Sequence, residues 1–279
     1  MALAFPMTLP APAKINLCLR ILGRRADGYH ELQTAFQILD VADELTFSEA
    51  SELLVSGAEG VPMEEDLVYR AAKLLEPSAT RPATAHIDVS KVIPMGAGLG
   101  GGSSNAATTL VALNQLWGCG LTEAELCELG RELGADVPVF IQGYSAWGEG
   151  IGEALTPLNL PEQVFLLVYP NCHVSTAEVF SHPDLTRDSS AITIARFLSL
   201  GAGNDCENVV CRLYPEVAMS LDWLNNFGSA KMTGTGSCVF LPCESMDSAK
   251  AVQSKVPAEW QAFVAIGMNQ SKLKLELTR

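Results

Sequence analysis

The sequence predicts an α+β protein with two domains that divide near residue 158. Strand-like and helical segments are mixed along the chain without the strict alternation that a parallel α/β sheet requires. A strand-like segment over residues 144–158 ends between Pro157 and Pro161, which mark a linker. The length of 279 residues fits one large domain or two modest ones. We therefore expect a first domain over residues 1–158 and a second over residues 159–279.

Each element is predicted from the spacing of its apolar residues. In the first hundred residues this spacing gives a helix at 67–75 and strands at 15–22, 44–47, 52–55 and 85–89. A helix at 106–116 closes near Gly118, and a second helix opens at Thr122 in a capping box with Glu125 and stops at Gly134. Beyond residue 158 we expect a strand at 163–169, two helices, a glycine turn at 233–237, a strand, a helix and a strand.

The composition excludes several classes of partner. The formal net charge is −14, so the protein lacks the overall basic character with which nucleic-acid and anionic-membrane binders release counterions. Eight cysteines at scattered spacings, with no CxxC pair, indicate free thiols in a reducing cytosol. Residues 1–12 do not have the pattern of a targeting peptide, and the longest apolar run, 164–169, is too short to cross a membrane. We expect a cytoplasmic protein that binds neither nucleic acid nor membrane, and the sequence leaves its oligomeric state open.

The most unusual stretch of the sequence is a glycine loop between a predicted strand and a predicted helix. Five of the seven residues from Gly96 to Gly102 are glycine, which lets several backbone N–H groups converge on one anion at a helix N-terminus. A Walker loop is excluded because no Lys or Arg occurs from Val92 to Gly130. The loop also satisfies the dinucleotide fingerprint, but residues 121–133 are predicted to be a helix where that fingerprint needs a strand.

Three blocks of the sequence together resemble the GHMP small-molecule kinases. They are the nucleotide loop at residues 94–104, the segment at 12–17 and the glycine turn at 233–237. Within these kinases, residues 24–32, 134–140 and 204–207 resemble the family that acts on 4-diphosphocytidyl-2-C-methyl-D-erythritol. The resemblance implies a two-domain GHMP kinase fold, with an N-terminal domain like ribosomal protein S5 domain 2 and a C-terminal ferredoxin-like domain. It implies an ATP-dependent kinase of the non-mevalonate isoprenoid pathway that phosphorylates the 2-hydroxyl of that substrate.

The resemblance also implies two catalytic residues. Phosphoryl transfer to a hydroxyl needs positioning, charge neutralisation and an acceptor for the hydroxyl proton. Asp136 would take the proton as a base, and Lys14 would steady the carboxylate and the developing alkoxide. The alternatives are that Asp136 is only a helix cap and that Lys14 is only a surface lysine.

The nucleotide site implied by the resemblance is the glycine loop itself. ATP would be bound by Pro94, Met95, Gly96, Ala97, Gly98, Leu99, Gly100, Gly101, Gly102, Ser103 and Ser104. A kinase of this type requires Mg²⁺ to bridge the phosphates, and the loop-to-helix junction places Ser103 and Ser104 nearest to it.

The acceptor site implied by the resemblance draws on four parts of the chain. Asn16 lies two residues after Lys14 and so shares its strand face, and the resemblance implies that it holds the erythritol hydroxyls. Tyr29 and His30 would recognise the cytosine by stacking and hydrogen bonding, and Phe180 would close the other side of the ring. The second glycine turn, which would lie against the substrate's diphosphate and the nucleotide loop, comprises Thr233, Gly234, Thr235 and Gly236.

Three other functions stay open on the sequence. Another GHMP kinase, of the homoserine or mevalonate type, would have no use for Tyr29 and His30. A nicotinamide-dependent oxidoreductase would use the glycine loop for a pyrophosphate. A catalytically silent nucleotide-binding protein would not need both Lys14 and Asp136.

Overall fold

A computed structural model describes residues 4–57 and 60–278 of the chain. Its strands are β1 (Met7–Arg24), β2 (His30–Ser48), β3 (Leu53–Ser56), β4 (Ala85–Ser90), β5 (Ala146–Glu149), β6 (Ala154–Pro157), β7 (Val164–Tyr169), β8 (Lys231–Met232), β9 (Val239–Cys243) and β10 (Gln261–Met268). Its α-helices are α1 (Leu67–Leu75), α2 (Gly101–Leu116), α3 (Glu123–Leu133), α4 (Val137–Gln142), α5 (Thr176–Ser181), α6 (Ile194–Leu200), α7 (Glu207–Leu213), α8 (Pro215–Asn225), α9 (Met246–Gln253) and α10 (Lys272–Leu277). Short 3₁₀ turns, Met63–Glu65 and Glu76–Ser78, precede and follow α1.

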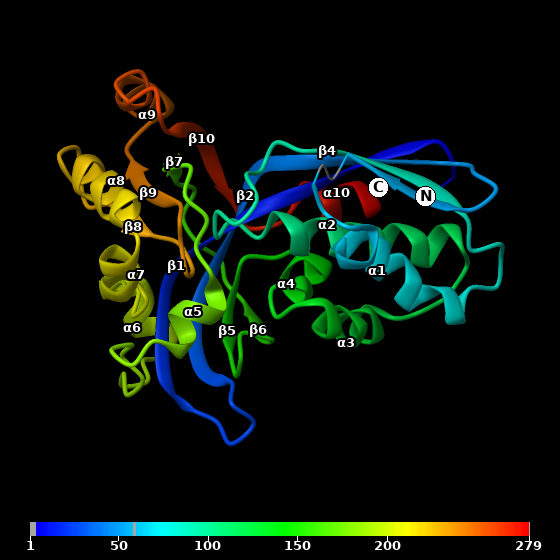
Figure 1. The fold of residues 1–279 in the computed structure, drawn as a ribbon, viewed down its shortest axis with the longest axis horizontal. Coiled ribbons are helices and arrows are strands. Elements are labelled where there is room, and N and C mark those ends of the chain that lie inside the picture. The colour runs from blue at the N-terminus through cyan, green and yellow to red at the C-terminus, as the bar shows by residue number, and fades with distance from the viewer. Residues whose placement is uncertain (1–3, 58–59, 279) are drawn as a thin grey trace.

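The long strand β2 joins the two halves of the molecule. One edge of β2 pairs antiparallel with β1 along nearly its whole length. The other edge pairs in turn with β5 at residues 34–36, with β10 at 38–39 and with β4 at 44–48. Figure 1 shows the β1–β2 hairpin crossing the molecule, with α1–α4 on one side and α6–α8 on the other. A residue on this hairpin can therefore contact both halves.

The C-terminal half has a ferredoxin-like arrangement. Its strands lie in the order β10-β7-β9-β8, all antiparallel, and the helices of this half fall between β7 and β8 and between β9 and β10. This is the β-α-β-β-α-β pattern of a ferredoxin-like domain, in which helices connect β7 to β8 and β9 to β10. The expected ferredoxin-like domain is confirmed.

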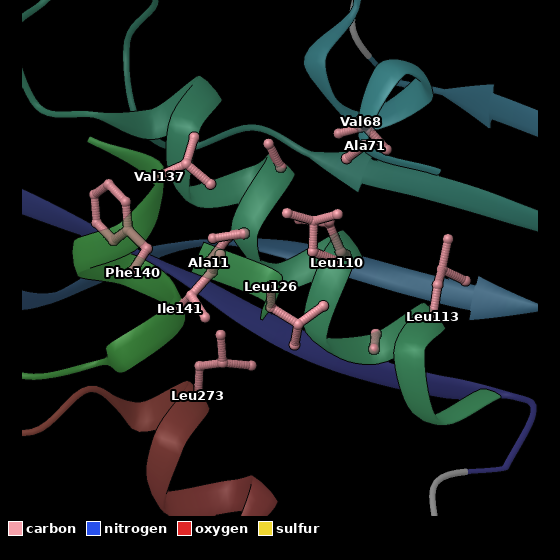
Figure 2. Packing of buried hydrophobic residues seen from close by; sticks show 14 of the residues in the cluster. Ala11, Val68, Ala71, Leu110, Leu113, Leu126, Val137, Phe140, Ile141 and Leu273 are labelled. Atoms are coloured by element: carbon pink, nitrogen blue, oxygen red, sulfur yellow. The ribbon is translucent and has the colours of Figure 1, made fainter. Parts of the chain in front are cut away.

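The N-terminal half is built around one apolar cluster beneath the sheet. Figure 2 shows its packing, in which α1 contributes Val68, α2 contributes Leu110 and α4 contributes Phe140. The last helix, α10, returns to this cluster and buries Leu273 in it. Helix α10 thus packs on the first half of the molecule, and a division into two domains at residue 158 stays a prediction.

Several predicted elements match the structure closely, and others differ for a clear reason. The helix predicted at 67–75 is α1, and α3 begins with the predicted capping box between Thr122 and Glu125. Helix α2 begins earlier than predicted, at Gly101, because a glycine-rich segment gives no apolar periodicity to mark a helix start. Four helices, rather than two, follow β7, and three of them (α5, α6 and α7) have only six or seven residues, which is too few to show a helical period. No helix within residues 4–57 and 60–278 is long and apolar enough to span a bilayer.

Candidate active site

One elongated cavity of about 1050 Å³ lies where the two halves meet. The glycine loop and the residues just before α1 line one end, and Leu19, Leu32 and Phe180 line the other. Lys14 and Asp136 lie on its wall between these ends. Its volume lies just above the roughly 300–1,000 Å³ that small-molecule sites commonly enclose.

Strand β1 contributes two polar residues to the cavity, Lys14 and Asn16, and its pairing with β2 is irregular on both sides of them. The register of β1 against β2 shifts between Pro12 and Lys14 and again between Asn16 and Cys18. Such bulges re-aim side chains next to active sites. Ala13 and Ile15 alternate with the two polar residues and are fully buried in an apolar cluster. The predicted common face is confirmed, because Lys14 Nζ donates a hydrogen bond to Asn16 Oδ1 at 2.7 Å.

The ammonium group of Lys14 is held by several oxygen atoms. It lies 3.1 Å from Asp136 Oδ2 and donates to the backbone oxygen of Gly98 at 3.1 Å. The Lys14 side chain is only 4% exposed, so the interpretation of Lys14 as a surface lysine is wrong. Asn16 is fixed in turn, because its Nδ2 donates to Thr34 Oγ1 at 2.7 Å.

Asp136 occupies the N-cap position of α4 but does not cap it. Its side chain accepts no capping hydrogen bond, and Pro138 lies in the first turn of the helix. The carboxylate instead pairs with Lys14 and remains 33% exposed towards the cavity that it lines. The interpretation of this residue as only a helix cap is therefore wrong. One oxygen of a carboxylate in this position can accept a proton from a bound hydroxyl.

The glycine loop is anchored at alternate residues rather than flexible. The side chains of Ala97 and Leu99 are buried in the apolar cluster that holds Ile15, and the backbone oxygen of Leu99 accepts a hydrogen bond from Lys14 N at 3.0 Å. Leu99 does not line the cavity, whereas the other predicted residues from Pro94 to Ser103 do. Gly100 has a φ of +74°, and a Cβ there would lie 2.8 Å from the Phe140 ring and 3.1 Å from Lys14 Cε.

The second glycine turn packs directly on the first. A Cβ at Gly98 would lie 2.7 Å from the backbone oxygens of both Thr233 and Gly236. Thr233 Oγ1 accepts a hydrogen bond from Asn16 N at 2.8 Å, and Thr235 Oγ1 lies 2.9 Å from Thr176 Oγ1. Of this turn, Gly234 and Thr235 line the cavity. Residues 233–236 therefore lie against the nucleotide loop, as the sequence predicts.

The start of α2 presents buried oxygen atoms with no partner. Ser104 Oγ and Asn105 Oδ1 are buried and form no hydrogen bond, while Ser103 lines the cavity. Within the part of the chain that the structure describes, no group of three His, Cys, Asp or Glu side chains could hold a metal ion alone. Hard oxygen donors suit Mg²⁺, which keeps several waters and phosphate ligands and needs only one or two protein groups.

The aromatic residues predicted to bind cytosine are only partly assembled. His30 and Phe180 stack with ring centroids 5.2 Å apart and planes inclined at 29°. Tyr29 lies in the turn of the β1–β2 hairpin and is 61% exposed, and neither Tyr29 nor His30 lines the cavity itself. The pKa of His30 is lowered, first by burial and then by the nearby charges of Arg187 and Arg24. The lowered pKa favours the neutral imidazole of His30.

Two charged residues near the cavity escaped the sequence reasoning. Lys91 forms an ion pair with the buried Asp43, and its Nζ lies 3.3 Å from the position of a Cβ on Gly101. The stretch without cations starts one residue later, so the loop has a lysine beside it after all. Arg187 donates a hydrogen bond to His30. The position of Lys91, between a predicted strand at 85–89 and the glycine loop, was a usable signal, whereas nothing local marks Arg187.

Two family models match this chain in succession. The model described as GHMP kinases N terminal domain matches residues 66–144, and the one described as GHMP kinases C terminal matches residues 183–262. Together they cover more than half of the sequence. The chain belongs to the GHMP kinase family. The two-domain GHMP kinase fold is thereby confirmed.

Relatives of this GHMP kinase carry a more specific name. It is 53% identical over 267 residues to the 4-diphosphocytidyl-2-C-methyl-D-erythritol kinase of Nitrosococcus oceani, covering 95% of each chain. It is 50% identical over 270 residues to the enzyme of that name from a Marinomonas species, covering 95% of this chain and 88% of the relative. A crystal structure of 4-(cytidine 5'-diphospho)-2C-methyl-D-erythritol kinase is 35% identical, with a TM-score of 0.83, and covers 94% of this chain and 100% of its own.

More distant members share the fold alone. The structure of homoserine kinase from Cytophaga hutchinsonii has a TM-score of 0.70 at 15% identity, covering 98% of each chain. The oxidoreductase interpretation of this GHMP kinase is wrong, because α2 is followed by α3 and not by the parallel strand that a dinucleotide-binding unit needs.

Proposed function

We propose that this protein is an ATP-dependent kinase that phosphorylates the 2-hydroxyl of 4-diphosphocytidyl-2-C-methyl-D-erythritol, giving the 2-phosphate and ADP, in the non-mevalonate isoprenoid pathway. Relatives about 50% identical over nearly the whole chain carry that kinase's name. The observation that carries the proposal is the Lys14–Asp136 pair between a glycine cradle and a paired His30 and Phe180. ATP is the co-substrate expected of a GHMP kinase.

In this proposal the chain's own residues position the reactants and move one proton. Backbone N–H groups of the glycine loop and the N-terminus of α2 hold the nucleotide phosphates. The substrate hydroxyl lies beside Asp136, which accepts its proton as the oxygen attacks the γ-phosphoryl group in line. Lys14 stabilises the developing alkoxide, and Asn16 orients the neighbouring hydroxyls. The second glycine turn packs against the nucleotide loop and contacts the substrate's diphosphate.

Mg²⁺ is part of the proposal, and the start of α2 fits it. Ser103 is at the cavity, and the unpartnered oxygens of Ser104 and Asn105 lie in the same turn. These oxygens would hold the ion together with the phosphates. The ion, when bound, neutralises charge on the β- and γ-phosphates.

The cellular setting proposed for the protein is the cytoplasm. The eight cysteines are free, and burial raises the pKa of the thiols of Cys206 and Cys238 to about 12, which keeps them unreactive. The net charge of −14 supports a small-molecule acceptor rather than nucleic acid or an anionic membrane.

A panel of acceptors tests the proposal against its nearest rival. Purified protein with ATP and Mg²⁺ is assayed for ADP release with 4-diphosphocytidyl-2-C-methyl-D-erythritol, homoserine and mevalonate as separate acceptors. We expect turnover only with the first, and inhibition of that turnover by CMP in competition with the acceptor. Equal or greater kcat/KM with homoserine or mevalonate would refute the proposal.

A further inference from the structure

Arg187 lies in the irregular segment between α5 and α6 and makes four hydrogen bonds. Its Nε donates to His30 Nε2 at 3.0 Å, across 157 residues of sequence. Its terminal nitrogens donate to the backbone oxygens of Leu185 at 3.1 Å and of Phe180 and His182 at 2.8 Å each. One guanidinium thus holds both a side chain on β2 and the end of the helix that carries Phe180.

We infer that Arg187 is a positioning residue of the cytosine site, because its guanidinium fixes the tautomer of His30 and holds that ring against Phe180. The inference rests on the proposed function for the identity of the base that is bound. It does not require Arg187 to touch the substrate.

The tautomer follows from hydrogen-bond chemistry. A guanidinium has five N–H donors and no acceptor, so the ring nitrogen that faces it must offer a lone pair. His30 Nε2 is therefore unprotonated, and in a neutral imidazole the hydrogen must then be on Nδ1. Nδ1 has no hydrogen-bond partner among the residues that the structure describes, and it is not among the buried atoms that lack one. His30 is thereby prepared as a hydrogen-bond donor towards an acceptor atom on the edge of a base.

The same guanidinium aligns the two rings. Phe180 is the penultimate residue of α5, and its carbonyl is one of the groups that α5 leaves free for a partner. Because Arg187 bonds this carbonyl and His30 together, it keeps the two ring planes within 29° of each other. The surrounding segment is itself tied to the hairpin, since Ser189 N donates to the oxygen of Ile21 and Ile192 N to Gln33 Oε1.

Kinetics of three variants test the inference. Arg187→Met should raise KM for the cytidylyl substrate about tenfold, the effect of losing a hydrogen bond to a charged group, with kcat and KM for ATP nearly unchanged. Arg187→Lys keeps the charge but has a single nitrogen in place of the separate Nε and Nη2 that bond His30 and Phe180, so it should behave like Arg187→Met. The control is Arg212→Met, which removes an exposed arginine paired with Asp184 at 3.0 Å and should leave all three constants unchanged. A wild-type KM in Arg187→Met or Arg187→Lys would overturn the inference, as would an equal rise of both KM values.

Two further measurements separate positioning from general support of the fold. In a His30→Ala background, Arg187→Met should raise KM far less than it does in the wild type, whereas fully additive effects would overturn the inference. Nitrogen-15 NMR of the imidazole in the ligand-free wild type should show the hydrogen of His30 on Nδ1, and a hydrogen on Nε2 would overturn the inference. This spectrum needs no substrate, so it stands even if the wild type fails to phosphorylate the cytidylyl acceptor. That failure would refute the proposed function instead.

Discussion

The two ends of the cavity are built in different ways. The nucleotide end is mostly backbone: glycines at positive φ, a helix N-terminus, and anchors at Ala97 and Leu99. The acceptor end is mostly side chains, brought by the β1–β2 hairpin and by irregular chain near α5. At the nucleotide end an added Cβ would collide with backbone at Gly98, whereas at the acceptor end each side chain that is removed should cost affinity separately. The predictions below test this contrast.

The largest expected effect is at the junction of the two ends. Asp136→Asn should lower kcat by roughly 10²–10⁴, the usual range for a lost general base, while ATP binding stays nearly intact. Single-turnover rates and nucleotide titration measure the two quantities separately. If the variant kept full activity, Asp136 would not be the base, and positioning would be the remaining source of catalysis.

The next largest effect is expected for alanine at Gly98. Comparison with alanine at Gly120 separates the steric clash of the new Cβ from the strain of a positive φ. Gly98 and Gly120 have nearly equal φ values, +73° and +71°, but a Cβ at Gly120 would meet nothing within 4 Å. Alanine at either site forces an L-residue into the left-handed region, at roughly 1–2 kcal/mol. Only at Gly98 would the new Cβ also force the backbones of the two glycine turns apart. Only Gly98→Ala should therefore lose activity, about 100-fold for a displacement on the order of 1 Å.

Steady-state activity, KM for ATP and urea unfolding, measured on both alanine variants, check this prediction. Equal losses of activity in Gly98→Ala and Gly120→Ala would show that the contact between the two glycine turns has no catalytic importance.

Removal of a single side chain at the acceptor end should have a smaller and selective effect. His30→Ala should raise KM for the cytidylyl substrate by about tenfold and leave KM for ATP close to the wild-type value. Steady-state kinetics with each substrate varied in turn measures both. An equal rise in the two constants would mean that His30 supports the fold rather than the acceptor site.

The mildest test changes only the pH. The pKa of His30 is lowered below its ordinary 6.5 by burial and by Arg187 and Arg24. The folded state therefore binds fewer protons there than the unfolded chain, so the contribution of His30 to stability is complete above pH 6.5 and is lost as the pH falls through the lowered pKa. Over the same window KM for the cytidylyl substrate should rise and KM for ATP should not. His30→Gln should remove this dependence, and its persistence in that variant would assign it to another group.

The contrast between the two ends also explains what the sequence could predict. The glycine loop was recognisable because closely packed backbone at positive φ admits almost only glycine, which leaves a local signature. The capping box of α3 is local in the same way. The contact of Arg187 with His30 spans 157 residues and depends on how an irregular segment docks on a hairpin, so no local pattern encodes it. Resemblance to a family supplied Phe180, but the stacking of its ring on His30 came only with the structure.

Lys91 shows that the absence of cations within a loop does not exclude a cation beside it in the folded protein. The sequence has no cation from Val92 to Gly130, so neither the glycine loop nor α2 carries one. Folding returns the end of β4 to the loop and places the Lys91 ammonium beside Gly101. An acidic protein with a net charge of −14 thus has one lysine beside its nucleotide loop, Lys91 paired with Asp43, and another between the two ends of the cavity, Lys14 paired with Asp136.

The product of the reaction tests the central claim most directly. Phosphorus-31 NMR of a mixture of the protein, ATP, Mg²⁺ and 4-diphosphocytidyl-2-C-methyl-D-erythritol follows every phosphate at once. We predict one new phosphomonoester signal, equal in amount to the ADP formed, while the diphosphate signals of the acceptor persist. Release of inorganic phosphate alone, or extension of the acceptor's diphosphate, would contradict transfer to the hydroxyl beside Asp136.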